Sequence, residues 1–120
     1  MVFNNIVISK SKSFALRGIK LYKFLSLEKK EYILSVQILK SSTSIGANIR
    51  EATRAQSVPD FYSKLNIALK EAEETAYWLE LLAESSYITQ KQFNSLYDDC
   101  EEIIRLLVVL TKKQKNTPKE

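Results

Sequence analysis

The sequence predicts an all-α protein, and within that class an antiparallel up-down-up-down four-helix bundle. Only two glycines and two prolines occur in 120 residues, far fewer than the tight turns of a many-stranded fold require. Apolar residues recur at spacings of three and four through four successive segments, which is the pattern of amphipathic helices. Short connections place neighbouring helices antiparallel, and 45% hydrophobic content suffices for one packed core. We therefore expect a single domain over residues 1–113, followed by a polar tail at 114–120 that frays.

The first expected helix begins at Ser9 or Ser11 and ends at about Leu25. One of its sides is apolar at helical spacing, whereas the other side carries several cations. The apolar side consists of Phe14, Ala15, Gly18, Ile19, Leu21, Tyr22 and Leu25.

The second expected helix begins in the segment 26–31 and ends at about Ala55. Ser26 is expected to cap it, with Glu28 in the first turn, where a carboxylate suits the positive end of the helix dipole. Gly46 interrupts this helix at a cost of about 1 kcal/mol relative to alanine. That cost indicates that the backbone of another helix passes close to Gly46.

Two capping signals mark the starts of the third and fourth expected helices. Ser57 precedes the third helix, which ends near residue 86, and Asp60 stands where a capping box places a carboxylate. Thr89, with Gln92 three residues later, forms the second capping box. The fourth helix follows, with Cys100 on its apolar stripe, where we expect a core residue.

The composition argues against catalysis. With no histidine, the chain lacks the commonest neutral-pH general base and metal ligand. Cys100 alone cannot form an internal disulfide or a cysteine zinc site, and Gly18 and Gly46 stand too far apart for a glycine-rich phosphate loop. We expect a protein that is not an enzyme and has no catalytic residue, metal or cofactor.

The sequence also predicts a cytoplasmic protein. The N-terminal stretch has no basic segment before an apolar run, and the longest aliphatic run, 106–110, is far shorter than the roughly 18 residues of a membrane span. A single cysteine agrees with a reducing compartment.

The charge is unevenly distributed. Residues 1–55 hold ten lysines and arginines against three carboxylates, whereas residues 56–120 hold eight against eleven. This asymmetry fits charge complementation inside the bundle, an acidic partner or RNA. Cations at helical spacing on the first two expected helices form the candidate nucleic-acid surface, because each neutralised phosphate releases counterions and arginine grips two oxygens at once. The candidate residues are Arg17, Lys20, Lys40, Arg50 and Arg54.

Polar residues that interrupt the apolar stripes form a second candidate set, expected to specify the bundle or its oligomer. We expect them to pair with Lys64, Lys70, Arg50 or backbone groups, and Trp78 to act as an anchor more than as a base-stacking platform. Inward carboxylates from neighbouring helices also occur in di-iron bundles, but those sites use histidine, so a metal-dependent enzyme is a third hypothesis only. The set is Asn48, Glu51, Glu71, Glu74 and Trp78.

Specific strings in the second and third expected helices resemble a known family. Ser-Ile-Gly-Ala-Asn-Ile occupies 44–49 and Glu-Thr-Ala-Tyr-Trp-Leu occupies 74–79, accompanied by Gln37 and the Phe14-Ala15 pair. Together they resemble the four-helix bundle proteins encoded within 23S rRNA intervening sequences, which carry the older label of S23 ribosomal protein family.

The resemblance implies a ring, typically a homopentamer, in the bacterial cytoplasm, with no catalytic residues. It leaves the molecular function open, and the older label does not establish a ribosomal role. The family is also similar to Avd, the accessory variability determinant of diversity-generating retroelements, a basic ring that works with a reverse transcriptase and RNA. Two hypotheses follow: an RNA-binding homo-oligomer, or a structural or protein-interaction scaffold without nucleic-acid affinity.

Overall fold

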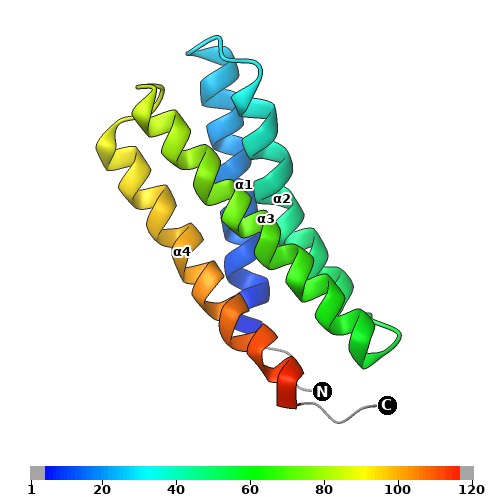
Figure 1. Ribbon diagram of the computed structural model, residues 1–120. Coiled ribbons are helices and arrows are strands. Elements are labelled where there is room, and N and C mark those ends of the chain that lie inside the picture. The colour runs from blue at the N-terminus through cyan, green and yellow to red at the C-terminus, as the bar shows by residue number, and fades with distance from the viewer. Residues whose placement is uncertain (1–4, 117–120) are drawn as a thin grey trace.

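The computed structural model describes residues 5–116, with side chains to residue 114, and shows four antiparallel helices (Figure 1). The bundle is elongated, with extents of 50 × 21 × 20 Å. No strand occurs in the described part, and none of its helices is long and apolar enough to cross a membrane. The elements are α1 (Asn5–Leu27), α2 (Leu34–Ala52), α3 (Val58–Glu84), α4 (Gln90–Lys112) and a 3₁₀ turn, η1 (Lys113–Asn116).

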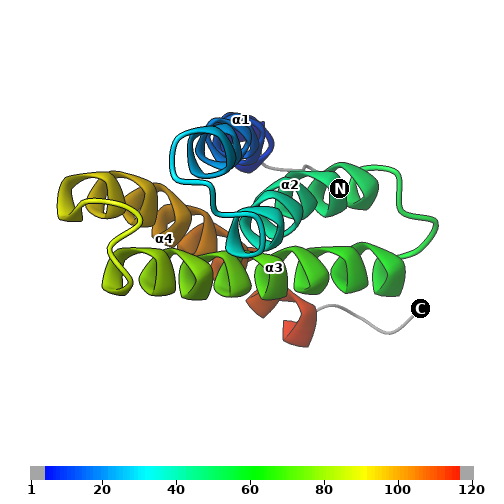
Figure 2. The same ribbon diagram turned by 90° about the horizontal axis from the view of Figure 1, so that it is seen from above.

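The helices pack in the order α1, α2, α3, α4. The pairs α1/α2, α2/α3 and α3/α4 are in contact over most of their length, whereas α1 meets α4 over a shorter stretch. Viewed from above, α1 lies farthest from α3, with α2 and α4 between them (Figure 2). The predicted four-helix bundle is therefore confirmed. Among its adjacent helices, α1 and α4 are the pair that packs least closely. The predicted fraying of the tail concerns mostly residues 117–120, which lie outside the described residues.

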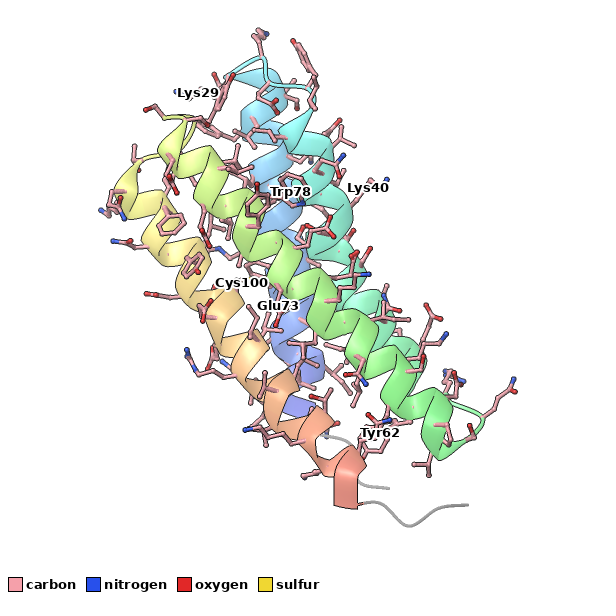
Figure 3. All side chains as sticks on the ribbon, viewed as in Figure 1. Lys29, Lys40, Tyr62, Glu73, Trp78 and Cys100 are labelled. Carbon is pink, nitrogen blue, oxygen red and sulfur yellow. The ribbon has the colours of Figure 1, made fainter. Side chains whose placement is uncertain are left out.

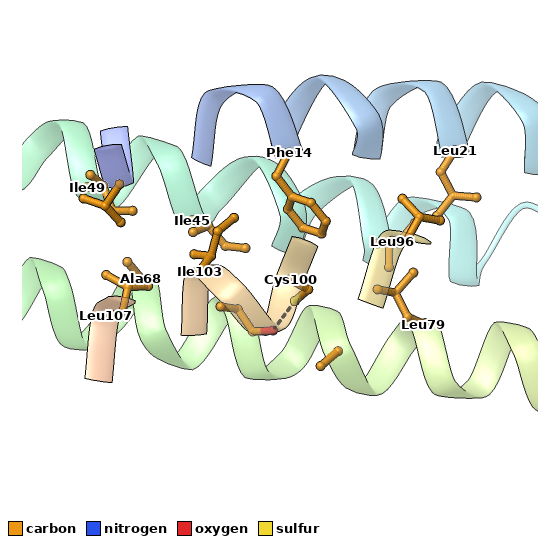
Figure 4. Close-up of a cluster of buried hydrophobic side chains, with 14 of the residues drawn as sticks. Phe14, Leu21, Ile45, Ile49, Ala68, Leu79, Leu96, Cys100, Ile103 and Leu107 are labelled. Atoms are coloured by element: carbon orange, nitrogen blue, oxygen red, sulfur yellow. Dashed lines mark hydrogen bonds between the residues drawn. The ribbon is translucent and has the colours of Figure 1, made fainter. Parts of the chain in front are cut away.

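The buried core is mostly aliphatic, and Figure 4 shows a part of it. Ile45, Ile103 and Leu107 are among its fully buried side chains. Cys100 is also fully buried, and its thiol donates a hydrogen bond to the backbone oxygen of Ala72 over 3.2 Å. Burial, then the nearby charges of Glu101 and Asp99, raises the pKa of the Cys100 thiol to about 12. The prediction that Cys100 is a core residue is confirmed.

Both predicted capping signals are present. The Oγ of Ser57 accepts a hydrogen bond from the backbone N–H of Asp60 over 3.1 Å, and α3 begins at the next residue, Val58. At the start of α4, the backbone N–H of Gln92 donates to Thr89 Oγ1, while the backbone N–H of Thr89 donates to Gln92 Oε1. These side chains satisfy N–H groups that have no partner inside the helix.

The predicted start of the second helix is wrong. Ser26 belongs to the last turn of α1, where its Oγ donates to the backbone oxygen of Tyr22 over 2.8 Å. Lys30 then adopts a left-handed conformation with φ of 55°, which ends the first helical segment without a glycine. The cap of α2 is Glu31, whose carboxylate accepts three backbone N–H groups over 2.7 to 3.2 Å. A serine followed closely by a carboxylate is therefore an ambiguous signal for a helix start, because the serine hydroxyl can also bond back to the helix that precedes it.

Two other boundaries differ from the prediction. The helix α1 begins at Asn5, earlier than Ser9, because its first turn places Val7 in the core. The helix α2 ends at Ala52, earlier than Ala55, where Thr53 Oγ1 donates to the oxygen of Arg50 over 2.6 Å.

The two glycines lie at the contact between α1 and α2. A Cβ on Gly46 would lie 3.5 Å from the backbone oxygen of Ser11, so the expected close approach is present but leaves room for a methyl group. A Cβ on Gly18 would lie only 2.7 Å from the Cβ of Ser42 and would also overlap the hydroxyl of Ser42. The glycine that this helix crossing requires is therefore Gly18.

We expect the two glycine-to-alanine changes to have opposite effects. Gly18→Ala should lower the free energy of unfolding by about 1–3 kcal/mol through overpacking, whereas Gly46→Ala should raise it by up to about 1 kcal/mol through helix propensity. Urea titrations followed by circular dichroism measure both. Adding Ser42→Gly to Gly18→Ala removes the clashing side chain and should recover part of the loss. Equal effects of the two alanines would contradict this account.

The stability contributed by Glu31 should depend on pH. Burial alone raises its pKa, but the N–H groups of Leu34, Ser35 and Ile33 outweigh burial, so the pKa of Glu31 in the folded protein lies below its ordinary value of 4.5. The carboxylate therefore stabilises the fold above the unfolded pKa, and this contribution is lost as pH falls through the folded pKa. We expect Glu31→Gln to cost about 1–2 kcal/mol at neutral pH and less at about pH 3.

Urea titrations of the wild type and Glu31→Gln at the two pH values give the comparison, because the other carboxylates titrate equally in both proteins. A difference that stays constant down to low pH would contradict the assigned cap.

Candidate functional surfaces

Arg17 connects α1 to α4. One of its guanidinium nitrogens lies 2.7 Å from Asp99 Oδ2 and 3.1 Å from the backbone oxygen of Ser95, and the other lies 2.9 Å from Ser95 Oγ. Two turns earlier on α1, Lys10 Nζ lies 3.1 Å from Glu102 Oε1. Part of the basic stripe of α1 is therefore complemented inside the bundle, as one of the alternatives from the charge distribution anticipated.

Lys20 lies in a groove of about 510 Å³ between α1 and α4. The groove exists because these two helices are only loosely closed against each other. Arg17 and Lys91 share it with Lys20, so three cations from two helices line the same hollow. The remaining lining residues are Leu21, Phe24, Gln92, Ser95 and Leu96, and they make the floor largely apolar.

Lys40 and Arg50 are exposed on α2, Arg54 is exposed in the turn that follows it, and Lys40 extends away from the bundle (Figure 3). Arg50 lines two hollows. The first, of about 300 Å³, lies between α1 and α2, and Lys12 lines it together with small residues. The second, of about 530 Å³, lies at the turn between α2 and α3, where Arg54 and Lys64 lie together with the carboxylates of Glu51 and Asp60.

The structure adds two cations that the sequence analysis did not single out. Lys12 follows Ile8 by four residues and precedes Ala15 by three, so its place on the α2 side of α1 was available from helical spacing. Lys91 carried no such signal. Lys91 lines the same groove as Lys20 only because α4 folds back against α1.

In the polar set, Glu51 pairs across α2 and α3, whereas Asn48 and Trp78 bond within their own helices. Glu51 Oε1 lies 3.7 Å from Lys64 Nζ, in agreement with the expected pairing of this set with Lys64. The amide of Asn48 donates to the backbone oxygen of Ser44 in its own helix over 2.8 Å. Trp78 Nε1 donates to Glu74 Oε1 over 3.3 Å.

Trp78 is half-buried against the core, whereas its neighbour Tyr77 is 54% exposed. Their ring centroids lie 5.4 Å apart at an angle of 55°. The packing of Trp78 agrees with the anchor interpretation. Tyr77 contributes an exposed aromatic surface on α3.

The carboxylate of Glu71 is perturbed by its surroundings. Burial first, and then Glu74, raises the pKa of Glu71, while Lys70 and Lys40 lower it. In residues 5–114, no group of three or more histidine, cysteine, aspartate or glutamate side chains is placed to hold a metal ion.

A further acidic surface lies across α3 and α4. The phenol of Tyr97 donates to Glu80 Oε2 over 3.2 Å, and its ring stacks on Phe93 at 4.7 Å. Burial, then Glu101 and Glu80, raises the pKa of Tyr97 to about 12. The two carboxylates therefore meet at one phenol, although they come from different helices.

The bond between Arg17 and Asp99 should be measurable by a double-mutant cycle. Both side chains are more than a third exposed, so we expect a coupling energy of roughly 0.5–1 kcal/mol from the two alanine variants and their combination. The matched cycle at Lys10 and Glu102 should give a smaller value, because a single ammonium contact replaces the guanidinium fork. No coupling between Arg17 and Asp99 in urea titrations would contradict their role in closing α1 against α4.

Comparisons with known proteins place this chain among related bundles. The family model of the 23S rRNA-intervening sequence protein matches residues 4–109. A crystal structure from Bacteroides thetaiotaomicron VPI-5482, of a protein with unknown function from the S23 ribosomal protein family, is 58% identical and has a TM-score of 0.89, covering 90% of this chain and 96% of that one. No curated protein matches. The resemblance predicted from the sequence strings is confirmed: the chain belongs to the family of 23S rRNA-intervening sequence proteins.

Proposed function

We propose that the protein is a non-enzymatic bundle of the bacterial cytoplasm that assembles with copies of itself and binds RNA. The observation that carries the RNA proposal is the position of Arg50 between two hollows, with Lys12 on one side and Arg54 on the other. Together with Lys40, these residues form what we call the α1/α2 basic face. It gathers the exposed cations Lys40 and Arg50 of α2 with Lys12 of α1 and Arg54 of the turn after α2.

The chemistry of this face suits a phosphate backbone. Guanidinium groups bind two phosphate oxygens at once, and each neutralised phosphate releases counterions. The residues that line the hollow beside Arg50 include the small residues Ala15, Gly46 and Ala47, which leave space beside the cations.

The five cations predicted from the sequence have unequal roles in this proposal. Lys40, Arg50 and Arg54 contact phosphates. Arg17 is held by Asp99 and Ser95, so it acts mainly within the bundle. Lys20 lies in the separate groove between α1 and α4, so it stands outside the basic face.

Self-assembly is the second part of the proposal, with the homopentameric ring as the expected form. The basic first half and acidic second half of the chain support it, because copies of such a molecule attract one another through unlike faces. Within each bundle, Glu51 of α2 then helps to fix the register against α3 through its pairing with Lys64.

A scaffold without nucleic-acid affinity is the alternative. The ion pairs of Arg17 with Asp99 and of Lys10 with Glu102 favour it, because they show cations of α1 complemented within the chain. In that case, the remaining cations would serve protein contacts.

Fluorescence anisotropy with a structured RNA at about 50 to 200 mM salt tests the proposal. We expect the logarithm of the wild-type binding constant to fall linearly with the logarithm of salt concentration. The variant Arg50→Glu with Arg54→Glu should bind at least about tenfold more weakly, since each lost phosphate contact removes released counterions. The matched control, Arg105→Glu with Lys112→Glu, changes the same charge on α4 and should bind like the wild type.

Sedimentation of the same variants separates the two candidate functions. An unchanged assembly mass with lost RNA binding supports the basic face. A loss of assembly in Arg50→Glu with Arg54→Glu would instead make those arginines interface residues. If the wild-type protein does not bind RNA even at the lowest salt concentration, the RNA proposal is wrong and the scaffold without nucleic-acid affinity remains.

A further inference from the structure

The groove between α1 and α4 combines two properties that differ from those of the α1/α2 basic face. Its floor includes Leu21, Phe24 and Leu96, and its rim carries Lys20 and Lys91, which are exposed. A phosphate backbone gains little from an apolar floor, whereas a protein surface with apolar and acidic side chains complements both floor and rim. The groove is therefore better matched to protein than to RNA.

The chain itself carries a surface of this matching kind. Glu73, Glu80 and Glu84 follow one another at seven and four residues on α3, so they share one side of that helix. Tyr77, 54% exposed, lies among them. We call these four residues, with Glu101 of α4, the acidic ridge.

The ridge is continuous across the two helices. Tyr97 of α4 donates to Glu80, and Glu101 stands near the same phenol, so carboxylates from α3 and α4 meet there. Glu73 and Glu84 are exposed, and neither forms an ion pair within 4.0 Å among the described side chains. These carboxylates are therefore available to cations of another molecule.

We propose that the acidic ridge of one copy docks into the groove between α1 and α4 of the next copy. Lys20 and Lys91 meet the carboxylates of Glu73 and Glu84, and the ring of Tyr77 covers the apolar floor. This inference rests on the self-assembly in the proposed function and assigns the surfaces that carry it.

The position of the two surfaces permits continued assembly. The groove lies on the α1 side of α4 and the ridge on its α3 side, so one copy can use both at the same time. A contact between two unlike surfaces repeats from copy to copy and produces either a closed ring or an open filament. A symmetric dimer would need one self-complementary surface instead.

Charge reversal on each surface tests the proposal. The groove variant is Lys20→Glu with Lys91→Glu, and the ridge variant is Glu73→Lys with Glu84→Lys. Each creates like charges at the contact, so each should sediment as a single chain of 13.8 kDa. The quadruple variant reverses both surfaces, restores opposite charges and should recover the wild-type assembly mass. The variant Arg105→Glu with Lys112→Glu is the control and should keep that mass.

Several outcomes would overturn the assignment. If both double variants keep the wild-type mass, the interface lies elsewhere while self-assembly stands. If all variants are folded by circular dichroism but the quadruple variant stays a single chain, the two surfaces do not meet. If the groove variant assembles normally and loses RNA binding, the groove serves RNA. A wild-type chain that sediments as a monomer at about 100 μM would contradict self-assembly itself, and with it this interface.

Discussion

The packing of α1 depends on the close contact between Gly18 and Ser42. Because glycine has no Cβ, α1 approaches α2 there more closely than any side chain on residue 18 would permit. On its opposite side α1 meets α4 over a shorter stretch, where Arg17 and Lys10 form ion pairs with Asp99 and Glu102. The asymmetric position of α1 leaves the groove that is lined by Lys20 and Lys91.

This arrangement divides the basic half of the chain into parts with different surroundings. Arg17 is engaged with α4, Lys20 lies over an apolar floor, and Arg50 lies on an open outer face among small side chains. The same type of charge therefore lies in three different surroundings, and we propose a different role for each: closure of the bundle, association with an acidic protein surface and binding of phosphate. Net charge and helical spacing alone do not distinguish among them.

Sequence reasoning succeeded where the controlling interaction is local. The caps at Ser57 and Thr89 were predictable because each acts on an N–H group three residues away. The prediction for Ser26 failed because a serine can cap the helix that follows it or bond back to the helix that precedes it. Which carboxylate caps α2 is decided by the buried position of Glu31. The role of Cys100 followed from its position on an apolar stripe.

The sequence by itself determined the helical class, four helical segments, a buried cysteine, the uneven charge and the family, because periodicity, composition and short strings are properties of the chain alone. The tertiary structure alone decided which cations are engaged and which surfaces they share. Arg17 meets Asp99 across a separation of 82 residues, and Lys91 meets Lys20 in one groove. Such contacts depend on how closely each helix pair packs, and that is set by side-chain volumes from several helices at once.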